Sequence, residues 1–442
     1  MSSMETSFNS QHSSQTNVQP DLQPCTPDRI THLPGYGAVD EVQFAGYASV
    51  RSDSGTDSPL QTDEQLFYWF VGAEDYAQKP TILWTNGGPG SSSFWGFFLE
   101  NGPYVIDDTG STLSKRPHAW NNHANYMIFE HPLSVTLSVA HDANDIPNTV
   151  EQGIDQLYQA LLNFIHLHPE IAKKPIILAG ESYAGTYLPL LAKAILQGNR
   201  LGATPLDLRV MVLCDAWVNP MVQMATDTTW AFSHGLISSS QKRWLDETYA
   251  DRLPLINAAI QQICGCYMTN TAQTADPSFQ PIYDYLNNPA VREALHVPAN
   301  YPKLTQNWSA QISNHYAAQV NDSYAPVVQA LLDGGENFGL DPQSQLLLLD
   351  GSRLTVRMIS GLNDAKDCNF LGTGAWIDLL QGDGALSFRE AKSVQWKDDQ
   401  ANVLGFEQSG GQLGWLKVLN AGHMASRDQP RLIHYIMDTL QK

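Results

Sequence analysis

Short apolar runs that alternate with amphipathic stretches are the main pattern in the first half of the chain. Apolar runs bounded by polar or glycine-containing segments predict strands at 42–50, 66–71, 80–85, 126–130, 176–179 and 208–213. The polar segment 51–64 is expected to join the first two strands as a hairpin. Apolar residues at helical spacing predict a helix over 149–168, and a second helix is expected at 187–196. Strands that alternate with helices indicate a mostly parallel sheet covered by helices on both faces.

The pattern changes between about 216 and 340, where the sequence is polar and helical and shows no buried strand. Strand patterns return at 355–360 and 414–419, and a last helix is expected at 429–441. We therefore predict an α/β core formed by 28–215 and 341–442, with 216–340 as a helical insertion or lid. Residues 1–27 are rich in Ser, Gln and Asn and are predicted to be a disordered leader.

Composition and charge exclude several classes of protein. The 442 residues carry a net charge of −20, which disfavours binding to nucleic acid or to anionic membranes. No apolar run approaches the roughly 20 residues that span a bilayer, and the N-terminus lacks the features of a secretory signal. We expect a cytoplasmic protein, or a secreted or vacuolar one if a signal segment has been removed. The five cysteines predict neither a disulfide framework nor a metal site.

The hexapeptide Gly-Glu-Ser-Tyr-Ala-Gly at 180–185 lies between a predicted strand and a predicted helix. This context is typical of a nucleophile elbow, in which the residues two before and two after the serine must be small. Gly180 and Ala184 meet this requirement, so Ser182 is predicted to be a nucleophile. A serine that caps an ordinary strand-to-helix turn would give the same short pattern.

A nucleophilic serine needs a base and an acid, which follow it in the order Asp or Glu, then His, in α/β-hydrolases. Asp364 follows the predicted strand at 355–360, and His423 follows the one at 414–419. We predict that His423 removes the proton of Ser182 and that Asp364 orients the imidazole. Asp367 is an alternative to Asp364, and Asp364 could instead stabilise a turn.

Two backbone N–H groups are predicted to form the oxyanion hole. One belongs to Tyr183, and the other to Gly88 in the glycine-rich loop 86–90. The loop lacks the Lys-Ser/Thr pair of a phosphate-binding P-loop. No cofactor and no metal ion are therefore predicted.

Longer motifs around these residues resemble those of the serine carboxypeptidases. Segments 84–93 and 100–103 resemble the oxyanion-loop signature of that family, and 180–185 matches its nucleophile motif. Its histidine motif is similar to 421–424 and 428–430. The resemblance extends from about residue 28 to the end of the chain. It implies an α/β-hydrolase fold with a mostly parallel central sheet.

The resemblance also implies a site for the C-terminal carboxylate of the substrate, at Asn86, Glu100 and Glu181. Two protein carboxyl groups that face a third carboxylate cannot all be ionised, so at least one keeps its proton and donates a hydrogen bond. Such a site favours mildly acidic pH. From the residues alone, Glu100 could form a salt bridge in a helix turn, and Glu181 could be solvated.

The chain departs from the family pattern at four places. Ser91 replaces the cysteine of the oxyanion loop, which fits a reducing compartment. Segment 133–139, which helps to shape the acyl-side pocket in the family, lacks the usual glycines and aromatic residues. Segment 213–216 is Leu-Cys-Asp-Ala in place of Ile-Gly-Asn-Gly. The loop after Asp364 is one residue longer, which is why Asp367 stays an alternative.

We expect a serine hydrolase that acts on a small peptide or acyl substrate through an acyl-Ser182 intermediate. It would release a C-terminal residue or a related carboxylate-bearing group. An acyltransferase or tailoring enzyme of specialised metabolism is the first alternative, because both reactions use the same acyl-enzyme and differ only in the acceptor. A catalytically inactive binding protein is the second.

Overall fold

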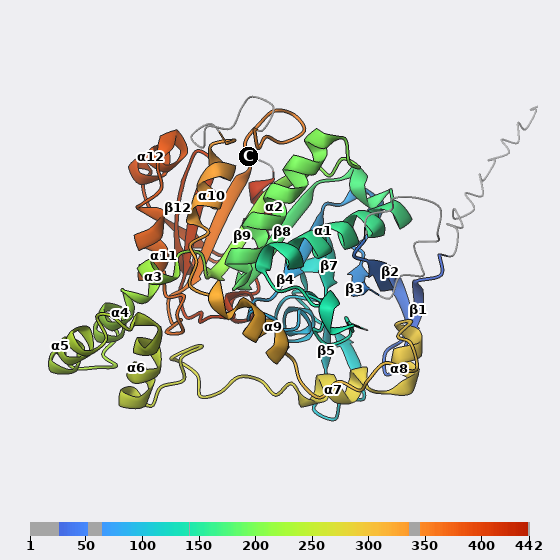
Figure 1. The fold of residues 1–442 in the computed structure, drawn as a ribbon, viewed down its shortest axis with the longest axis horizontal. Helices are drawn as coiled ribbons and strands as arrows, with labels where there is room; N and C mark the ends of the chain where they lie inside the picture. The colour runs from blue at the N-terminus through green and yellow to red at the C-terminus, as the bar shows by residue number, and fades with distance from the viewer. Residues whose placement is uncertain (1–25, 52–63, 141, 336–344, 441–442) are drawn as a thin grey trace, which may run out of the picture.

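The computed structural model describes residues 26–51, 64–140, 142–335 and 345–440. Except for residues 26 and 27, the predicted leader at 1–27 lies outside these ranges. The central feature of the described residues is a sheet of eleven strands in the order β1-β2-β3-β7-β4-β8-β9-β10-β13-β12-β11 (Figure 1). Its strands are β1 (Arg29–Leu33), β2 (Gly37–Ser49), β3 (Gln65–Val71), β4 (Thr81–Thr85), β7 (Asn125–Phe129), β8 (Ile176–Ser182), β9 (Leu208–Ala216), β10 (Thr355–Gly361), β11 (Val394–Lys397), β12 (Val403–Gly410) and β13 (Leu413–Val418).

The centre of the sheet is parallel and both of its edges are antiparallel. Strands β7, β4, β8, β9, β10 and β13 pair in parallel. Strands β2 and β3 pair antiparallel, as the predicted hairpin requires, while residues 52–63 of its joining segment lie outside the described ranges. The antiparallel pair β11–β12 at the opposite edge was not predicted. A separate two-stranded sheet is formed by β5 (Tyr104–Ile106) and β6 (Leu113–Lys115).

Alternate residues of the central strands enter two hydrophobic clusters, one on each face of the sheet. Met211 and Leu213 of β9 belong to one cluster, whereas Val210 and Val212 belong to the other. Both sets are buried because helices cover both faces, as expected for a parallel sheet. Helices that contribute to the first cluster are α1 (Val150–Leu167), α2 (Ala184–Leu201), α9 (Ala310–His315), α10 (Ala325–Leu332), α11 (Phe370–Ile377) and α12 (Gly382–Glu390).

The second face is covered by short helices from separate parts of the chain. The π-helical segment η2 (Trp95–Glu100) follows the glycine-rich loop and supplies Phe97 and Phe98. The others are α7 (Gln280–Leu286), α8 (Pro289–Ala294), α13 (Ala425–Asp428) and α14 (Leu432–Thr439). This arrangement confirms the predicted α/β-hydrolase architecture, in which the carboxyl ends of the parallel strands carry the site.

Within 216–340, only some of the helices stand away from the sheet. Helices α4 (Asp227–Ser233), α5 (Ser239–Thr248) and α6 (Ile256–Cys264) form a protruding unit with its own hydrophobic cluster (Figure 1). The short helix α3 (Pro220–Met224) leads into this unit. Helix α10 instead packs against α2. The division into a core and an insertion at 216–340 stays a prediction.

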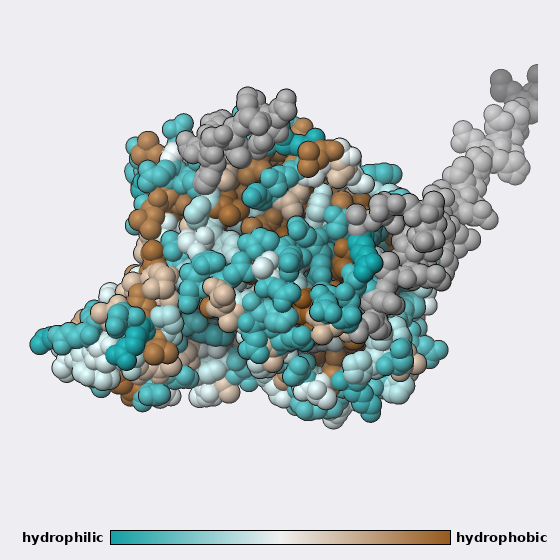
Figure 2. Space-filling view, in the orientation of Figure 1, coloured by the Kyte–Doolittle hydropathy of each residue, from teal (hydrophilic) through white to brown (hydrophobic). Residues whose placement is uncertain are grey.

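The viewed surface of the molecule is largely polar. Figure 2 shows hydrophilic side chains over much of this face, with hydrophobic ones scattered among them. No helix in the described ranges combines the length and the apolar character that crossing a membrane would require.

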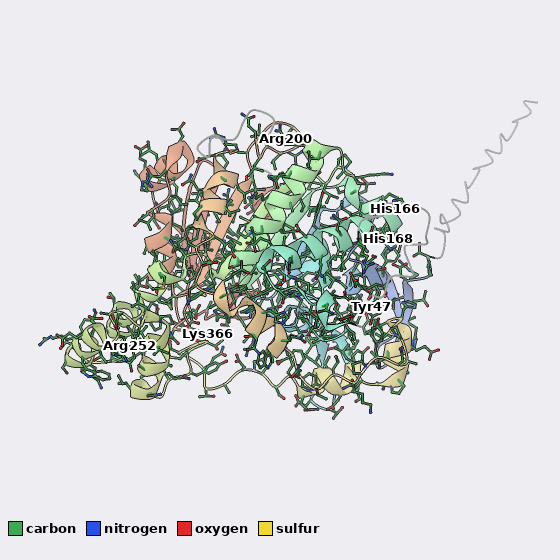
Figure 3. All side chains as sticks on the ribbon, in the orientation of Figure 1. Tyr47, His166, His168, Arg200, Arg252 and Lys366 are labelled. Atoms are coloured by element: carbon green, nitrogen blue, oxygen red, sulfur yellow. The ribbon has the colours of Figure 1, made fainter. Side chains whose placement is uncertain are left out.

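A buried polar cluster links Asp28, just before β1, to His168 at the end of α1. The Asp28 carboxylate accepts a hydrogen bond from the Tyr68 hydroxyl at 2.6 Å and lies 2.7 Å from Nε2 of His168, which Figure 3 labels. Burial alone would raise the pKa of Asp28. The hydrogen bond and the charge of His168 outweigh this effect, together with the hydrogen bond from Tyr68, so the pKa is lowered. The ionised carboxylate therefore stabilises the folded state above the ordinary aspartate pKa of about 4.

Replacing Asp28 with asparagine is expected to lower the free energy of unfolding by about 1–3 kcal/mol at neutral pH, because a buried charged hydrogen bond is lost. The difference from wild type should narrow as pH falls through the lowered pKa, where the carboxylate becomes protonated. Thermal unfolding of both proteins at several pH values measures this difference in stability. Asp40→Asn, at an exposed position of β2, is the control. Equal stability of Asp28→Asn and wild type at pH 7 would contradict the prediction.

Candidate active site

Ser182 is the last residue of β8, and only Tyr183 separates it from the start of α2. Its backbone is left-handed, with φ of 61°, as expected for a strained turn between a strand and a helix. A Cβ at Gly180 would lie 2.3 Å from the carbonyl oxygen of Thr85 and 2.8 Å from Cβ of Ala184. The turn therefore tolerates only small residues on both sides of Ser182, as the sequence pattern predicted.

His423 and Asp364 are brought together by adjacent parallel strands. Asp364 follows β10 and His423 follows β13, so both lie at the carboxyl edge of the sheet. Nδ1 of His423 is 2.9 Å from Oδ2 of Asp364, and both residues are buried. Burial raises the pKa of Asp364, while the charge and hydrogen bond of His423 oppose the rise. Asp367 is half-buried and has no hydrogen bond to His423 within the described part of the chain.

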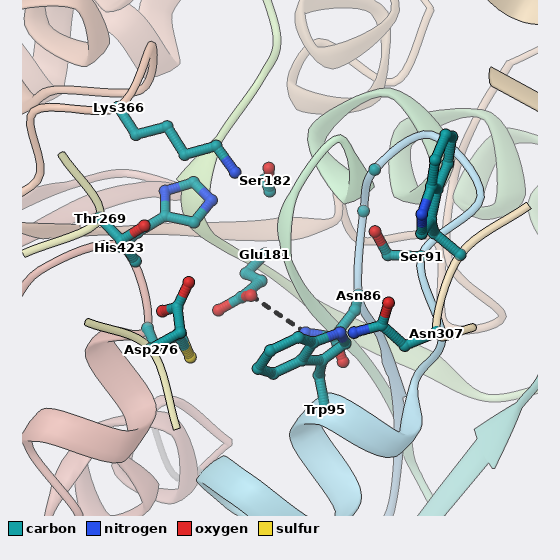
Figure 4. A pocket seen from close by; sticks show the side chains of 14 residues that line it. Asn86, Ser91, Trp95, Glu181, Ser182, Thr269, Asp276, Asn307, Lys366 and His423 are labelled. Atoms are coloured by element: carbon teal, nitrogen blue, oxygen red, sulfur yellow. Dashed lines mark hydrogen bonds between the residues drawn. The ribbon is translucent and has the colours of Figure 1, made fainter. Parts of the chain in front are cut away.

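Ser182 and His423 line one pocket of about 210 Å³. Figure 4 shows the imidazole beside the serine, with Glu181 and Asn86 below them. The two side chains are not joined by a direct hydrogen bond in this structure. Such contacts often tighten only when substrate is bound, so the placement fits a nucleophile and its base.

The glycine-rich loop between β4 and η2 lies against the backbone of Tyr183. A Cβ at Gly87 would lie only 2.2 Å from the Tyr183 nitrogen, so a residue with a side chain cannot occupy this position. Gly88 has φ of +113°, which also requires glycine. Neither the Gly88 nor the Tyr183 N–H is hydrogen-bonded to another described residue. Both predicted oxyanion donors are therefore free to bind a ligand.

Glu130, directly after β7, binds the residues that follow the glycines of the glycine-rich loop. It accepts hydrogen bonds from the Ser93 N–H at 2.7 Å and from the Ser92 hydroxyl at 2.6 Å. A third bond comes from the Thr136 hydroxyl, on the segment that departs from the family pattern. Burial raises the pKa of Glu130 to about 7, although these hydrogen bonds lower it. The glycine-rich loop and residues 134–138 of this segment are therefore held by the same buried carboxyl group.

Asn86, Glu100 and Glu181 form one buried cluster. The Nδ2 group of Asn86 donates to Oε1 of Glu100 and to Oε1 of Glu181, each at 3.0 Å (the second bond is drawn in Figure 4). Its Oδ1 atom accepts from Trp84 Nε1 and from the Gly96 N–H, both at 2.9 Å. These contacts fix the amide orientation. The solvated position considered for Glu181 is wrong, because Glu181 is buried. The salt bridge considered for Glu100 is not formed with any described residue, and this buried side chain accepts a hydrogen bond from the Asn86 amide instead.

The electrostatics of this cluster favour the neutral form of Glu181. Burial raises its pKa well above the ordinary value, and the nearby Glu100 raises it further. Oε2 of Glu181 is buried without a hydrogen-bond partner among the described residues, and Glu181 lines the pocket of Ser182. A protonated Glu181 thus has a donor available for a ligand that carries a carboxylate.

Several residues in or beside the site were not predicted, and four of them carry a hydroxyl group or a charge that bears on the chemistry. The Ser426 hydroxyl donates to Oε2 of Glu100 at 2.8 Å, and only its position on α13 after His423 could have indicated this role. Asp215 is fully buried and accepts a hydrogen bond from the Gly361 N–H. Its position in segment 213–216, which departs from the family pattern, was the only signal in the sequence. Lys366 and Asp276 line the pocket, and no motif marks either. Among the described residues no group of three or more His, Cys, Asp or Glu is arranged to bind a metal ion.

Comparisons with known proteins agree with the fold and with the resemblance. The family model for serine carboxypeptidase matches residues 34–275 and 260–440. The chain is 26% identical to serine carboxypeptidase S10 family member 1 of Dictyostelium discoideum, covering 88% of this chain and 91% of that protein. It is 29% identical to carboxypeptidase Y homolog A of Neurospora crassa, covering 87% of this chain and 71% of that protein.

A solved structure gives the same fold. The prohormone-processing carboxypeptidase Kex1 of Saccharomyces cerevisiae superposes with a TM-score of 0.77 at 22% identity, covering 93% of this chain and 95% of that one. The match to the family model extends over nearly the whole described chain. The chain therefore belongs to the serine carboxypeptidase family and is a serine-type hydrolase of that kind.

Proposed function

We propose that the protein removes a C-terminal residue, or a related carboxylate-bearing group, from a small peptide or acyl substrate through an acyl-Ser182 intermediate. The observation that supports this most directly is the shared pocket. It holds a strained serine, an imidazole paired to a buried carboxylate, and a buried carboxyl group whose pKa is raised. A substrate carboxylate bound at Asn86 and Glu181 would bring the adjacent scissile carbonyl to Ser182.

The chemistry follows from these positions. His423 takes the proton of the Ser182 hydroxyl as its oxygen attacks the carbonyl carbon, and Asp364 stabilises the imidazolium. The N–H groups of Gly88 and Tyr183 stabilise the negative oxygen of the tetrahedral intermediate. His423 then gives the proton to the leaving nitrogen, and the C–N bond breaks. Water, activated by the same imidazole, hydrolyses the acyl-enzyme and restores the free serine.

Replacing Glu181 with glutamine is expected to change the pH dependence of KM for substrates that end in a free carboxylate. In the wild type, KM should rise as pH increases through the raised pKa of Glu181, because the ionised carboxyl group repels the substrate carboxylate. Glutamine does not titrate, so the part of the rise due to Glu181 should disappear. Steady-state kinetics between about pH 4 and pH 8 measure this.

Matched substrates with a C-terminal amide are the control, since they carry no charge at this site. Their KM is expected to be nearly the same for both forms of the enzyme at every pH. An equal effect of Glu181→Gln on acid and amide substrates would contradict the assignment of Glu181 to the carboxylate site.

The hydrolytic reaction itself is tested with blocked dipeptides. Mass spectrometry should detect the released C-terminal residue, and rapid acid quenching should trap an acyl group on the peptide that contains Ser182. Release of product with no acyl group on Ser182 under any quench condition would contradict the acyl-enzyme route.

Acyl transfer is a second candidate, favoured by a second cavity of about 310 Å³. The segment that departs from the family pattern lines it through Ser134, Thr136 and Ser138. The neighbouring segment 302–311 borders both this cavity and the pocket of Ser182. An acceptor alcohol bound there would compete with water for the acyl-enzyme. Free acid as the only product in the presence of every alcohol tested would reject this candidate.

A further inference from the structure

Lys366 brings a positive charge into the pocket of Ser182. It lies on the loop between β10 and α11, and Figure 3 places it between the sheet and the protruding helices. It lines the pocket together with Ser182 and His423. In Figure 4 its side chain extends past the imidazole, and the ammonium group points toward Ser182.

The backbone that carries Lys366 is held on both sides. The Ala365 N–H donates to the carbonyl of Met268 at 2.9 Å, and the Asn257 amide donates to the carbonyl of Ala365 at 2.6 Å. The N–H of Lys366 itself donates to Oδ1 of Asp364 at 2.8 Å. The following Cys368 is buried. The side chain is exposed but starts from a fixed backbone position, two residues after the Asp364 carboxylate that orients His423.

The charge of Lys366 is not neutralised by a protein partner. Its ammonium group forms no ion pair and no hydrogen bond with the residues that the structure describes. Asp276 lines the same pocket, and Lys366 lowers its pKa against the effect of burial, yet the two side chains are not paired. Burial and the nearby Glu100 raise the pKa of Glu181, which disfavours its negative form as a partner for Lys366. A ligand in the pocket would therefore meet an available cation beside the nucleophile.

The direction of Lys366 assigns it to one part of the substrate. In Figure 4, Glu181 and Asn86 lie on one side of Ser182, and Lys366 approaches from the other side. The proposed function places the carboxylate-bearing leaving group at Glu181 and Asn86. The acyl part, on the other side of the scissile carbonyl, would then come within reach of the Lys366 ammonium group.

We propose that Lys366 is a specificity-determining residue that selects substrates with a negatively charged acyl part, such as glutamate before the scissile bond. The assignment rests on the proposed function of Ser182. An ion pair in a pocket that is open to water contributes modestly, so the preference for a glutamyl over a glutaminyl substrate should be about threefold to tenfold in kcat/KM. It should decrease at high ionic strength.

The test compares two blocked dipeptides that differ only in glutamate or glutamine at the acyl position and share the same leaving residue. Wild type should prefer the glutamyl peptide, and Lys366→Arg should keep the preference. Lys366→Gln should remove it, and Lys366→Glu should reverse it. Lys392→Gln makes the same charge change at an exposed position after α12 and should leave the ratio unchanged.

The outcomes separate this assignment from the proposed function. Equal kcat/KM for the two peptides, or the same ratio for wild type and Lys366→Gln, would overturn the role of Lys366 while hydrolysis itself stands. Labelling of Ser182 by a fluorophosphonate without cleavage of either peptide would also overturn it. Absence of both labelling and cleavage would reject the proposed function, and the assignment of Lys366 with it.

Discussion

Replacing Ser182 with alanine is expected to lower kcat by roughly 10⁴- to 10⁶-fold and to abolish labelling by a fluorophosphonate. The hydroxyl is the atom that would bond to the substrate carbonyl, and no other pocket residue can take its place at the end of β8. The fold should be retained, since the hydroxyl forms no hydrogen bond with the described residues. Steady-state kinetics measure the loss of kcat, and mass spectrometry measures the loss of labelling. Thermal unfolding shows whether the fold is retained.

Ser91→Ala is the matched control for this experiment. Ser91 lines the same pocket, so the variant makes the same chemical change at a neighbouring position. It should keep labelling and turnover within a few-fold of wild type. Should the label instead persist in Ser182→Ala and disappear in Ser91→Ala, the nucleophile would be Ser91.

Asp364→Asn is expected to lower kcat by roughly 10³- to 10⁴-fold with a much smaller change in KM. Asp364 is fully buried, and its Oδ2 atom faces Nδ1 of His423 at 2.9 Å. An asparagine amide at this place would turn the imidazole into the wrong tautomer and would not stabilise the imidazolium. Steady-state kinetics on a blocked dipeptide measure the loss, and thermal unfolding shows whether the variant is folded.

Asp367→Asn provides the comparison, because Asp367 is the other aspartate that the sequence offers. It is half-buried and acts on Asp364 only through its charge. Activity within a few-fold of wild type is expected. Inactivity of Asp367→Asn together with full activity of Asp364→Asn would show that the orienting acid had been assigned to the wrong residue.

The central strands could be predicted from the sequence because they are buried on both faces. Strands β4, β7, β8 and β9 are almost entirely buried and each contains a run of apolar residues, which is recognised without knowledge of its neighbours. Strand β11 could not be predicted, since its four residues are mostly exposed and no apolar pattern distinguishes it from a loop. Its place depends on pairing with β12, which is a tertiary contact.

The candidate site was predictable to a similar degree. Ser182 and His423 lie in motifs whose spacing reflects the backbone of a turn, so the residues around them are restricted. Lys366 has no such restriction, because only the course of the loop decides whether its exposed side chain points into the pocket. The sequence favoured Asp364 as the acid but could not exclude Asp367, since the choice depends on which of them comes within reach of the imidazole.

The anchoring of two loops by Glu130 has a consequence for how this enzyme can evolve. The glycine-rich loop and the 134–138 segment bind the same buried carboxyl group. A mutation that reshapes the second segment for a new substrate and removes the Thr136 hydroxyl would also disturb the backbone that carries Gly88. A mutation of Thr136 would therefore change substrate selectivity and catalytic rate together. Adaptation to new substrates is easiest through mutations at positions that leave Thr136 in place.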